Sequence, residues 1–262
     1  MNLPSGTKTE KAAKSSHSGS ARREFRQFAL IVLGVLAARV VLAEPYYVPS
    51  GSMEPTLQIG DDLIASKFPY GYSRYSMLFG LGPASESRLF QRMPARGDVV
   101  VFRLPRDTSQ NYVKRVVGLP GDRLQVIGGR LWINDSELPL REDGNGPVEL
   151  SDGRQISVPQ LIETLPGGVE HKIFKLTWTG RMNDTEIYVV PPGHLFMMGD
   201  NRDNSLDSRV APDLGGVGFV PIENLVGRAE FVLGSWDFPI TSQPVWTWLQ
   251  GIRWNRFLSR IS

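Results

Sequence analysis

The sequence predicts a mainly β protein, with an antiparallel body that follows one N-terminal apolar helix. From Glu44 onward, short runs of β-branched and aromatic residues are separated by Gly, Pro, Asp and Asn. The 262 residues include 27 Gly and 19 Pro, which is typical of a strand- and turn-rich body, and 41% are hydrophobic, which suffices for a core. One long apolar run, at residues 27–43, stands apart from this pattern and predicts a helix.

Composition excludes several kinds of site. The chain has no Cys, so disulfides, thiol catalysis and Cys-based zinc sites are ruled out. A net charge of +2 gives no case for nucleic-acid binding. Residues 200–207 read DNRDNSLD, but Arg202 stands at the third position of a calcium loop and Ser205 at the position of its Gly. We therefore expect neither a metal nor a cofactor.

The N-terminus predicts a disordered basic tail and a membrane anchor. Residues 1–26 are small and polar, with six basic side chains against two acidic ones. Residues 28–43 would form a helix of about 24 Å, slightly short of a ~30 Å hydrocarbon core, while Gln27 extends it and Arg39 can snorkel to the interface. The basic tail would then stay in the cytoplasm and the body would lie outside. A cleaved signal peptide and a buried helix of a soluble protein are the alternatives.

The body is expected to contain short strands joined by turns. In chain order the expected strands are 46–48, 57–64, 98–102, 112–117, 123–127, 130–133, 186–190, 195–198, 219–220 and 225–233. Gly128 and Gly129 are a two-residue hairpin signal. Residues 66–96 have no clear periodicity and suggest a long surface excursion, and residues 134–190 suggest weak strands between polar loops.

Residues 49–56 read PSGSMEPT and directly follow the first expected strand. Gly51 permits a sharp turn and a close approach to a ligand, and the flanking prolines hold the chain extended. Two serine hydroxyls and exposed backbone N–H groups would suit a nucleophile and an oxyanion site. The same residues are equally typical of an ordinary turn.

A serine nucleophile needs a base, and lysine is the better candidate here. His17 lies in the tail, His171 in the hairpin region and His194 at a Pro-Pro-Gly turn, so we expect no histidine near this loop or a motif carboxylate. Lys114 lies inside the apolar run YVKRVV. It faces solvent if the strand alternates. If it faces inward, burial lowers its pKa and the neutral amine can take a proton from Ser52.

Four blocks together resemble a known family. PSGSMEPT, RGDVVVF, YVKRVVGLPGD and MGDNRDNSLDSR occur in this order behind the apolar run. This arrangement closely resembles bacterial signal peptidase I, the leader peptidase of the Ser-Lys type. The resemblance covers about residues 45–123 and 191–235.

The resemblance implies a role for each matching residue. Ser52 matches the nucleophile, Lys114 the general base and Ser50 the hydroxyl that joins the Ser52 N–H in the oxyanion hole. Ser205 matches the hydroxyl that orients the lysine amine. Asp207 and Arg209 match a carboxylate–guanidinium pair that braces the site, while Asp200 and Asn201 suggest loop-forming residues.

The resemblance also implies a substrate and a location. The family cleaves signal peptides of exported preproteins after small residues at −1 and −3, with the peptide bound as an extended strand. The residues at or near the implied pockets are Tyr46, Val48, Met53, Leu57, Val101, Tyr112 and Val113. The protein would be a single-pass protein of the bacterial inner membrane, with the bilayer as a partner and its catalytic domain on the periplasmic side.

The expected organisation has five parts. The tail (1–26) and anchor (27–43) precede a catalytic β core (44–123 and 192–240), which is interrupted by a smaller β-rich lobe (124–191). Residues 241–262 interleave Trp and Phe with Arg, which predicts either an interfacial segment or one packed on the body. Glu54 stands where the family often has an apolar residue, and we expect it to point to solvent because Met53 beside it points inward.

Other functions remain open at this point. A specialised maturation peptidase or a self-cleaving repressor would share the Ser-Lys chemistry, although residues 1–43 show no helix-turn-helix pattern. A non-catalytic surface binding module is a different class. It would need neither Lys114 nor Ser205.

Overall fold

The computed structural model describes residues 22–35, 42–77, 88–149, 154–237 and 245–262. The chain divides into two units, Met1–Val41 and Leu42–Ser262. Residues 22–35 of the first unit are helical, while residues 1–21 and 36–41 lie outside the described residues. The predicted helix does not extend to Ala43, which already begins the first strand. Among the helices that the structure describes, none combines the length and the apolar character needed to cross a bilayer.

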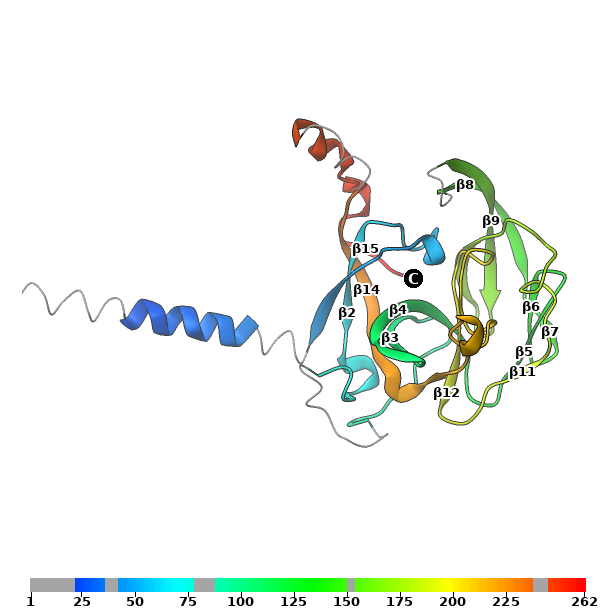
Figure 1. Ribbon diagram of the computed structural model, residues 1–262, viewed down its shortest axis with the longest axis horizontal. Helices are drawn as coiled ribbons and strands as arrows, with labels where there is room; N and C mark the ends of the chain where they lie inside the picture. Colours follow the sequence, from blue (N-terminus) through cyan, green and yellow to red (C-terminus); the bar gives the residue numbers. More distant parts are fainter. Residues whose placement is uncertain (1–21, 36–41, 78–87, 150–153, 238–244) are drawn as a thin grey trace, which may run out of the picture. The chain divides into compact units, whose positions relative to one another are not determined.

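The second unit is built on an antiparallel eight-stranded sheet (Figure 1). Its strands in spatial order are β1 (Ala43–Tyr47), β2 (Asp61–Ser66), β14 (Leu225–Ser235), β3 (Val99–Leu104), β4 (Asp107–Gly118), β12 (His194–Met198) and β13 (Val220–Pro221), with β15 (Ser259–Arg260) also on β14. Strands from both ends of the sequence alternate in this order. The mainly antiparallel β fold predicted from the sequence is therefore confirmed.

The core covers both faces of this sheet. On β3, Val99 and Val101 belong to one buried cluster, while Val100 and Phe102 belong to another. Successive side chains of a strand point to opposite faces, so a strand with both faces covered must be apolar throughout. This explains the unbroken apolar run VVVF at the centre of the sheet.

The residues between β4 and β12 form two smaller sheets of their own. One contains β11 (Tyr188–Val189), β5 (Arg123–Ile127), β6 (Arg130–Ile133) and β7 (Ser136–Glu137), and the other β10 (Val169–Phe174), β9 (Gln155–Leu165) and β8 (Leu140–Glu149). Gly128 and Gly129 have φ values of 53° and 77°, as the hairpin signal predicted. The expected lobe thus has its own strand pairing, within the single compact unit that starts at Leu42.

The chain enters and leaves these two sheets at one place. The Gly121 N–H donates to Val190 O at 2.9 Å, and the Val190 N–H donates to Asp122 O at 2.9 Å. We call this pair of backbone hydrogen bonds the neck. Because the neck closes the insertion, β4 and β12 remain neighbours in the main sheet across it.

The described part of residues 66–96 is more buried than expected. Tyr70 is 2% exposed and Arg88 is 6% exposed. The Arg88 guanidinium donates to the carbonyl oxygens of Tyr70, Gly71, Ile222, Glu223 and Leu225. These bonds fasten the excursion to the start of β14, because a buried guanidinium must satisfy its donors.

The C-terminal segment packs on the body through its arginines. Arg256 pairs with Asp61 at 2.5 Å, and Arg253 donates to Ile59 O at 2.8 Å. Trp254 is 67% exposed and stacks on Phe257, with ring centroids 5.2 Å apart. The segment therefore presents Trp254 outward, whereas a packed segment was expected to turn its aromatic side inward.

Candidate active site

The segment around Ser52 is a short turn anchored in the core. Gly51–Met53 forms one turn of 3-10 helix, and Met53 and Leu57 are fully buried beneath it. Asn201 holds the turn from the other side, since its Nδ2 donates to Gly51 O at 3.1 Å and its N–H donates to Ser52 O at 3.2 Å. The turn thus has a fixed backbone, as a positioned nucleophile requires.

Lys114 on β4 reaches this turn. Its Nζ donates to Ser52 Oγ at 2.6 Å, and the residue is only 3% exposed. Burial lowers the pKa of Lys114 to about 8, although the carboxylates of Asp207 and Asp200 oppose the shift. With a pKa of about 8, a large share of the Lys114 amines is neutral near pH 8.

The other two predicted serines lie beside this pair. Ser50 Oγ is 3.4 Å from Ser52 Oγ. Ser205 is 3% exposed, and its hydroxyl makes no hydrogen bond to any residue that the structure describes. A Cβ on Gly199 would lie 2.3 Å from Ser205 Oγ and 2.4 Å from Ser52 O. Only glycine at this position lets the two segments approach so closely.

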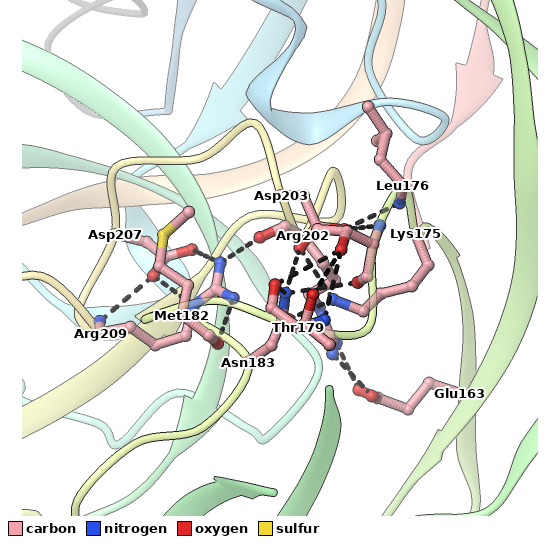
Figure 2. A network of polar contacts seen from close by, with 11 residues as sticks. Glu163, Lys175, Leu176, Thr179, Met182, Asn183, Arg202, Asp203, Asp207 and Arg209 are labelled. Atoms are coloured by element: carbon pink, nitrogen blue, oxygen red, sulfur yellow. Dashed lines mark hydrogen bonds and ion pairs between the residues drawn. The ribbon is translucent and has the colours of Figure 1, made fainter. Parts of the chain in front are cut away.

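Asp207 and Arg209 form a bidentate pair beneath the loop that carries Ser205. Arg209 Nε donates to Asp207 Oδ1 at 2.9 Å and Nη2 donates to Oδ2 at 2.8 Å. Burial alone would raise the pKa of Asp207, but the Arg209 guanidinium holds it below its ordinary value. Arg209 also donates to Arg202 O and to Met182 O, which Figure 2 shows within a larger polar network.

A second buried charge network lies next to the turn and was not predicted. Arg115 Nε and Nη2 donate to Asp200 at 2.8 and 2.7 Å, and Thr56 Oγ1 donates to the same carboxylate at 2.5 Å. His171 Nδ1 is 3.4 Å from Asp200, and its Nε2 is 3.2 Å from Glu163. The expectation that no histidine neighbours a motif carboxylate is therefore wrong. The long β9–β10 hairpin carries His171 to the catalytic core, which a linear sequence does not show.

The expectation for Glu54 is also wrong. Glu54 is only 8% exposed, and its Oε2 accepts a hydrogen bond from Asn201 Nδ2 at 3.3 Å. The alternation rule failed because this segment is a turn and not a strand. The side chain folds back over Gly51, where an added Cβ would lie 2.6 Å from the carboxylate oxygen.

A cleft of about 720 Å³ opens in front of Ser52 and Lys114. The residues that line it are Tyr46, Tyr47, Pro49, Ser50, Ser52, Leu63, Val101, Gln110, Asn111, Tyr112, Val113, Lys114, Met182, Asp203, Asn204, Ser205 and Leu206. All four proposed catalytic residues and four of the seven expected pocket residues are among them. The other three expected pocket residues, Val48, Met53 and Leu57, are core residues with at most 1% exposure.

Sequence reasoning missed part of this wall. Gln110 and Asn111 extend a strand that was expected to begin at Tyr112. Leu206 stands inside a quoted motif, and its apolar side chain in a polar loop was a signal that could have identified it. Met182 had no such signal. Within the described residues, no three His, Asp or Glu side chains gather as a metal site.

Comparisons with known proteins identify the family of the chain. The family described as signal peptidase, peptidase S26, matches residues 22–236. Signal peptidase I of Rickettsia conorii is 36% identical over 264 residues, covering 95% of this chain and 96% of that one. Signal peptidase I of Rickettsia typhi is 37% identical over 271 residues, covering 97% and 96%.

A solved signal peptidase I from Enterococcus faecalis aligns at 25% identity with a TM-score of 0.30, covering 52% of this chain and 97% of that one. The family match covers most of the sequence, including the turn with Ser52 and the strand with Lys114. The relatives match over nearly their whole length. The chain therefore belongs to the signal peptidase family, peptidase S26, and is a peptidase of the bacterial signal peptidase I type.

Proposed function

We propose that this protein is a membrane-anchored serine endopeptidase that removes signal peptides from exported preproteins, with Ser52 as nucleophile and Lys114 as general base. The observation that carries the proposal is the 2.6 Å contact between Lys114 Nζ and Ser52 Oγ in a site that buries the amine. A base must lie within hydrogen-bond reach of its proton and have a pKa near the working pH. Lys114 meets both requirements.

The chemistry follows from these positions. Neutral Lys114 takes the Ser52 hydroxyl proton while Oγ attacks the carbonyl carbon of the residue at −1. The resulting oxyanion accepts hydrogen bonds from the Ser52 N–H and the Ser50 hydroxyl. The Lys114 ammonium then gives its proton to the departing amine, which leaves an ester on Ser52. Water, deprotonated by Lys114, hydrolyses this ester and regenerates the free serine.

The remaining predicted residues support these two. Ser205 lines the same cleft as Lys114, and its hydroxyl would orient the Lys114 amine. The pair of Asp207 and Arg209 holds the backbone that precedes Ser205, because Asp207 accepts from the Gly199 N–H and Arg209 donates to Arg202 O. The fixed pair of charges is worth more inside the protein than at its surface, because little solvent screens it.

The cleft suits an extended peptide with small side chains at −1 and −3. Tyr46, Val101, Tyr112 and Val113 line it with bulky walls, and we expect these walls to admit only alanine-sized side chains at −1 and −3. Val48, Met53 and Leu57 would act from below by supporting these walls. Residues of β1 and β4 both border the cleft, so a bound strand could pair with their backbones.

The location is the bacterial inner membrane, with the bilayer as a partner. The apolar residues from 27 up to the start of β1 at Ala43 would serve as a single-pass anchor, residues 1–26 would stay in the cytoplasm, and the catalytic domain would lie on the periplasmic side. Support comes from the six basic side chains of the tail and the apolar sequence that follows them.

The test uses the full chain purified in detergent and a precursor with an Ala-X-Ala site. Ser52→Ala and Lys114→Met should abolish cleavage, and Ser205→Ala should lower it by about 10- to 100-fold. Lys172→Met, which removes a surface lysine that is more than half exposed, is the matched control and should cleave normally. The wild-type chain should also remain in carbonate-washed membranes.

Circular dichroism of each variant shows whether it folds. Wild-type-like cleavage by a folded Lys114→Met protein would disprove the proposed mechanism. Failure of the wild-type protein to cleave any Ala-X-Ala precursor would disprove the proposed substrate class.

A further inference from the structure

One residue of the cleft lining, Met182, comes from the inserted residues and not from the main sheet. The segment after β10, residues 175–183, runs to the loop that carries Ser205, and Met182 from this segment lines the cleft. Figure 2 shows the polar network that joins the two segments. No role was expected for this contact.

The contact is held by a buried lysine. Lys175 is 1% exposed, and its Nζ pairs with Asp203 Oδ1 at 2.8 Å and also donates to Asn183 Oδ1. Asn183 in turn donates to Thr179 O at 2.8 Å, which closes the segment on itself. A buried, hydrogen-bonded ion pair of this kind fixes geometry, because breaking it leaves an uncompensated charge.

The polar groups of this contact are already occupied. Asp203 Oδ2 accepts the N–H groups of Leu176 and Thr177 at 2.8 and 3.1 Å, while Oδ1 accepts from Lys175 and Asn183. Asp203 therefore has little acceptor capacity left for a ligand. What the two segments offer to a peptide is their apolar side chains.

Two apolar side chains remain. Met182 is half-buried, with its carbonyl oxygen bonded to Arg209 Nη1 at 3.3 Å, and Leu206 is 53% exposed. Both line the cleft with Ser205, the neighbour of the proposed catalytic pair. An exposed leucine beside a rigid loop and a backbone-anchored methionine form a contact surface that the polar network positions.

The cleft lining thus divides into two groups. Residues of β1, β3 and β4 account for the side chains at −1 and −3, whereas Met182 and Leu206 have no such assignment. An extended peptide that passes Ser52 must continue beyond the scissile bond. We propose that Met182 and Leu206 contact the first two residues of the mature protein, at +1 and +2, and so make the inserted residues part of the specificity site. This inference rests on the proposed function.

The residue types fit this role. Methionine is unbranched and polarisable, so it adapts to differently shaped partners. A surface of this kind favours apolar residues at +1 and +2 modestly and excludes few others. The walls at −1 and −3, in contrast, consist of aromatic and β-branched side chains on strands, and these discriminate by size.

Charge substitutions at Met182 test the proposal. Precursor peptides would share one Ala-X-Ala site and differ only in carrying Asp, Lys or Leu at +1 and +2. Met182→Glu should lower kcat/KM for the Asp peptide relative to the Lys peptide, and Met182→Lys should do the reverse. The ratio of kcat/KM for the Asp peptide to kcat/KM for the Lys peptide should differ by about 3- to 10-fold between Met182→Glu and Met182→Lys, as expected for partly exposed charge pairs.

Further variants sharpen the result. Met182→Leu should retain the wild-type profile, and Leu206→Ala should lower kcat/KM for the Leu peptide by about 3- to 10-fold. The matched control is the pair Ile127→Glu and Ile127→Lys, at a 45% exposed apolar residue of β5 that does not line the cleft. Neither control should change the ratio.

Two outcomes would overturn the inference. Equal effects of Met182→Glu on the Asp and Lys peptides would show that Met182 does not contact these residues. In a second peptide set that varies −1 and −3 and keeps +1 and +2 constant, a change in preference caused by Met182→Glu would assign Met182 to the other side of the bond. In both cases, Ser52-dependent cleavage by the wild-type protein would leave the proposed function intact.

Discussion

Two buried lysines of this protein, Lys114 and Lys175, differ in the partner that each amine meets. They are 3% and 1% exposed, so their depth is nearly the same. Lys114 Nζ bonds to the hydroxyl of Ser52, whereas Lys175 Nζ is paired with the carboxylate of Asp203. Burial lowers both pKa values, but at Lys175 the bonded carboxylate opposes this directly. The partner therefore decides whether a buried amine serves as a base or as a structural cation.

Because their partners differ, the two lysines also differ in their effect on the stability of the fold. A buried ammonium without a bonded carboxylate is destabilising, and its pKa falls in response. When a carboxylate and an amide surround a buried ammonium, their attraction to it offsets much of the desolvation cost. Burial of the Lys114 amine thus lowers the stability of the fold, and its proposed role as a base is a reason to keep it. The ion pair of Lys175, in contrast, stabilises the fold.

The largest expected effect comes from Lys114→Arg, which keeps the positive charge but removes the ability to lose a proton. Wild-type kcat/KM should rise with pH through about 8 and level off above it, because only the neutral amine accepts the Ser52 proton. Lys114→Arg should be lower by about 10²-fold or more at every pH. The measurement is a pH profile of precursor cleavage, and a flat wild-type profile between pH 6 and 9 would contradict it.

The next effect concerns stability and Lys175. Lys175→Met leaves Asp203 without its cation, which should lower the free energy of unfolding by about 3 kcal/mol. Urea unfolding of the full chain in detergent, followed by Trp fluorescence, measures this change. The double variant Lys175→Met with Asp203→Asn should recover part of the loss. If the single variant is as stable as the wild type, the two lysines do not differ as described.

The smallest effect has the opposite sign. Lys114→Met removes an ammonium that lacks a bonded counter-ion, so it should raise the free energy of unfolding by about 1–3 kcal/mol at pH 7. The folded-state pKa of about 8 lies below the ordinary value of 10.5, so the unfolded chain binds the proton more tightly. Wild-type stability from this group therefore rises between pH 8 and 10.5, and the gap to Lys114→Met should narrow. A constant gap from pH 7 to 10 would argue against a lowered pKa.

The sequence predicted most strands of the main sheet, because these strands carry their own local signals, but β15 was not expected. The apolar run at β3 and the Gly128-Gly129 hairpin needed no information from distant residues. The β8–β9–β10 sheet was predicted only as weak strands. Its outer positions are charged and exposed, as at Glu170 and Lys172, so the alternation has low contrast.

The candidate site was predictable where the four sequence blocks occur in the order typical of the family. The ordered blocks pointed to Ser52, Lys114 and Ser205, and the structure brings all three to one cleft. The contacts of Asn201, His171 and Met182 were missed for a common reason. Each joins segments that are far apart in the sequence, such as Asn201 and Gly51, whose spacing carries no periodicity. Such contacts exist only once the strands between them are paired.

The neck has a consequence for how such a chain can vary. Two backbone hydrogen bonds between Gly121, Asp122 and Val190 close the insertion at its base, so its length does not affect the register of β4 with β12. Insertions, deletions or a transplanted hairpin beyond the neck would leave the position and register of β4, the strand that carries Lys114, unchanged. Such changes are restricted by the return of residues 175–183 to the cleft and by the contacts of Glu163 and His171 with Arg202 and Asp200. On the proposed roles, a shortened variant would preserve Ser52 and Lys114 as nucleophile and base while altering which mature N-termini it accepts.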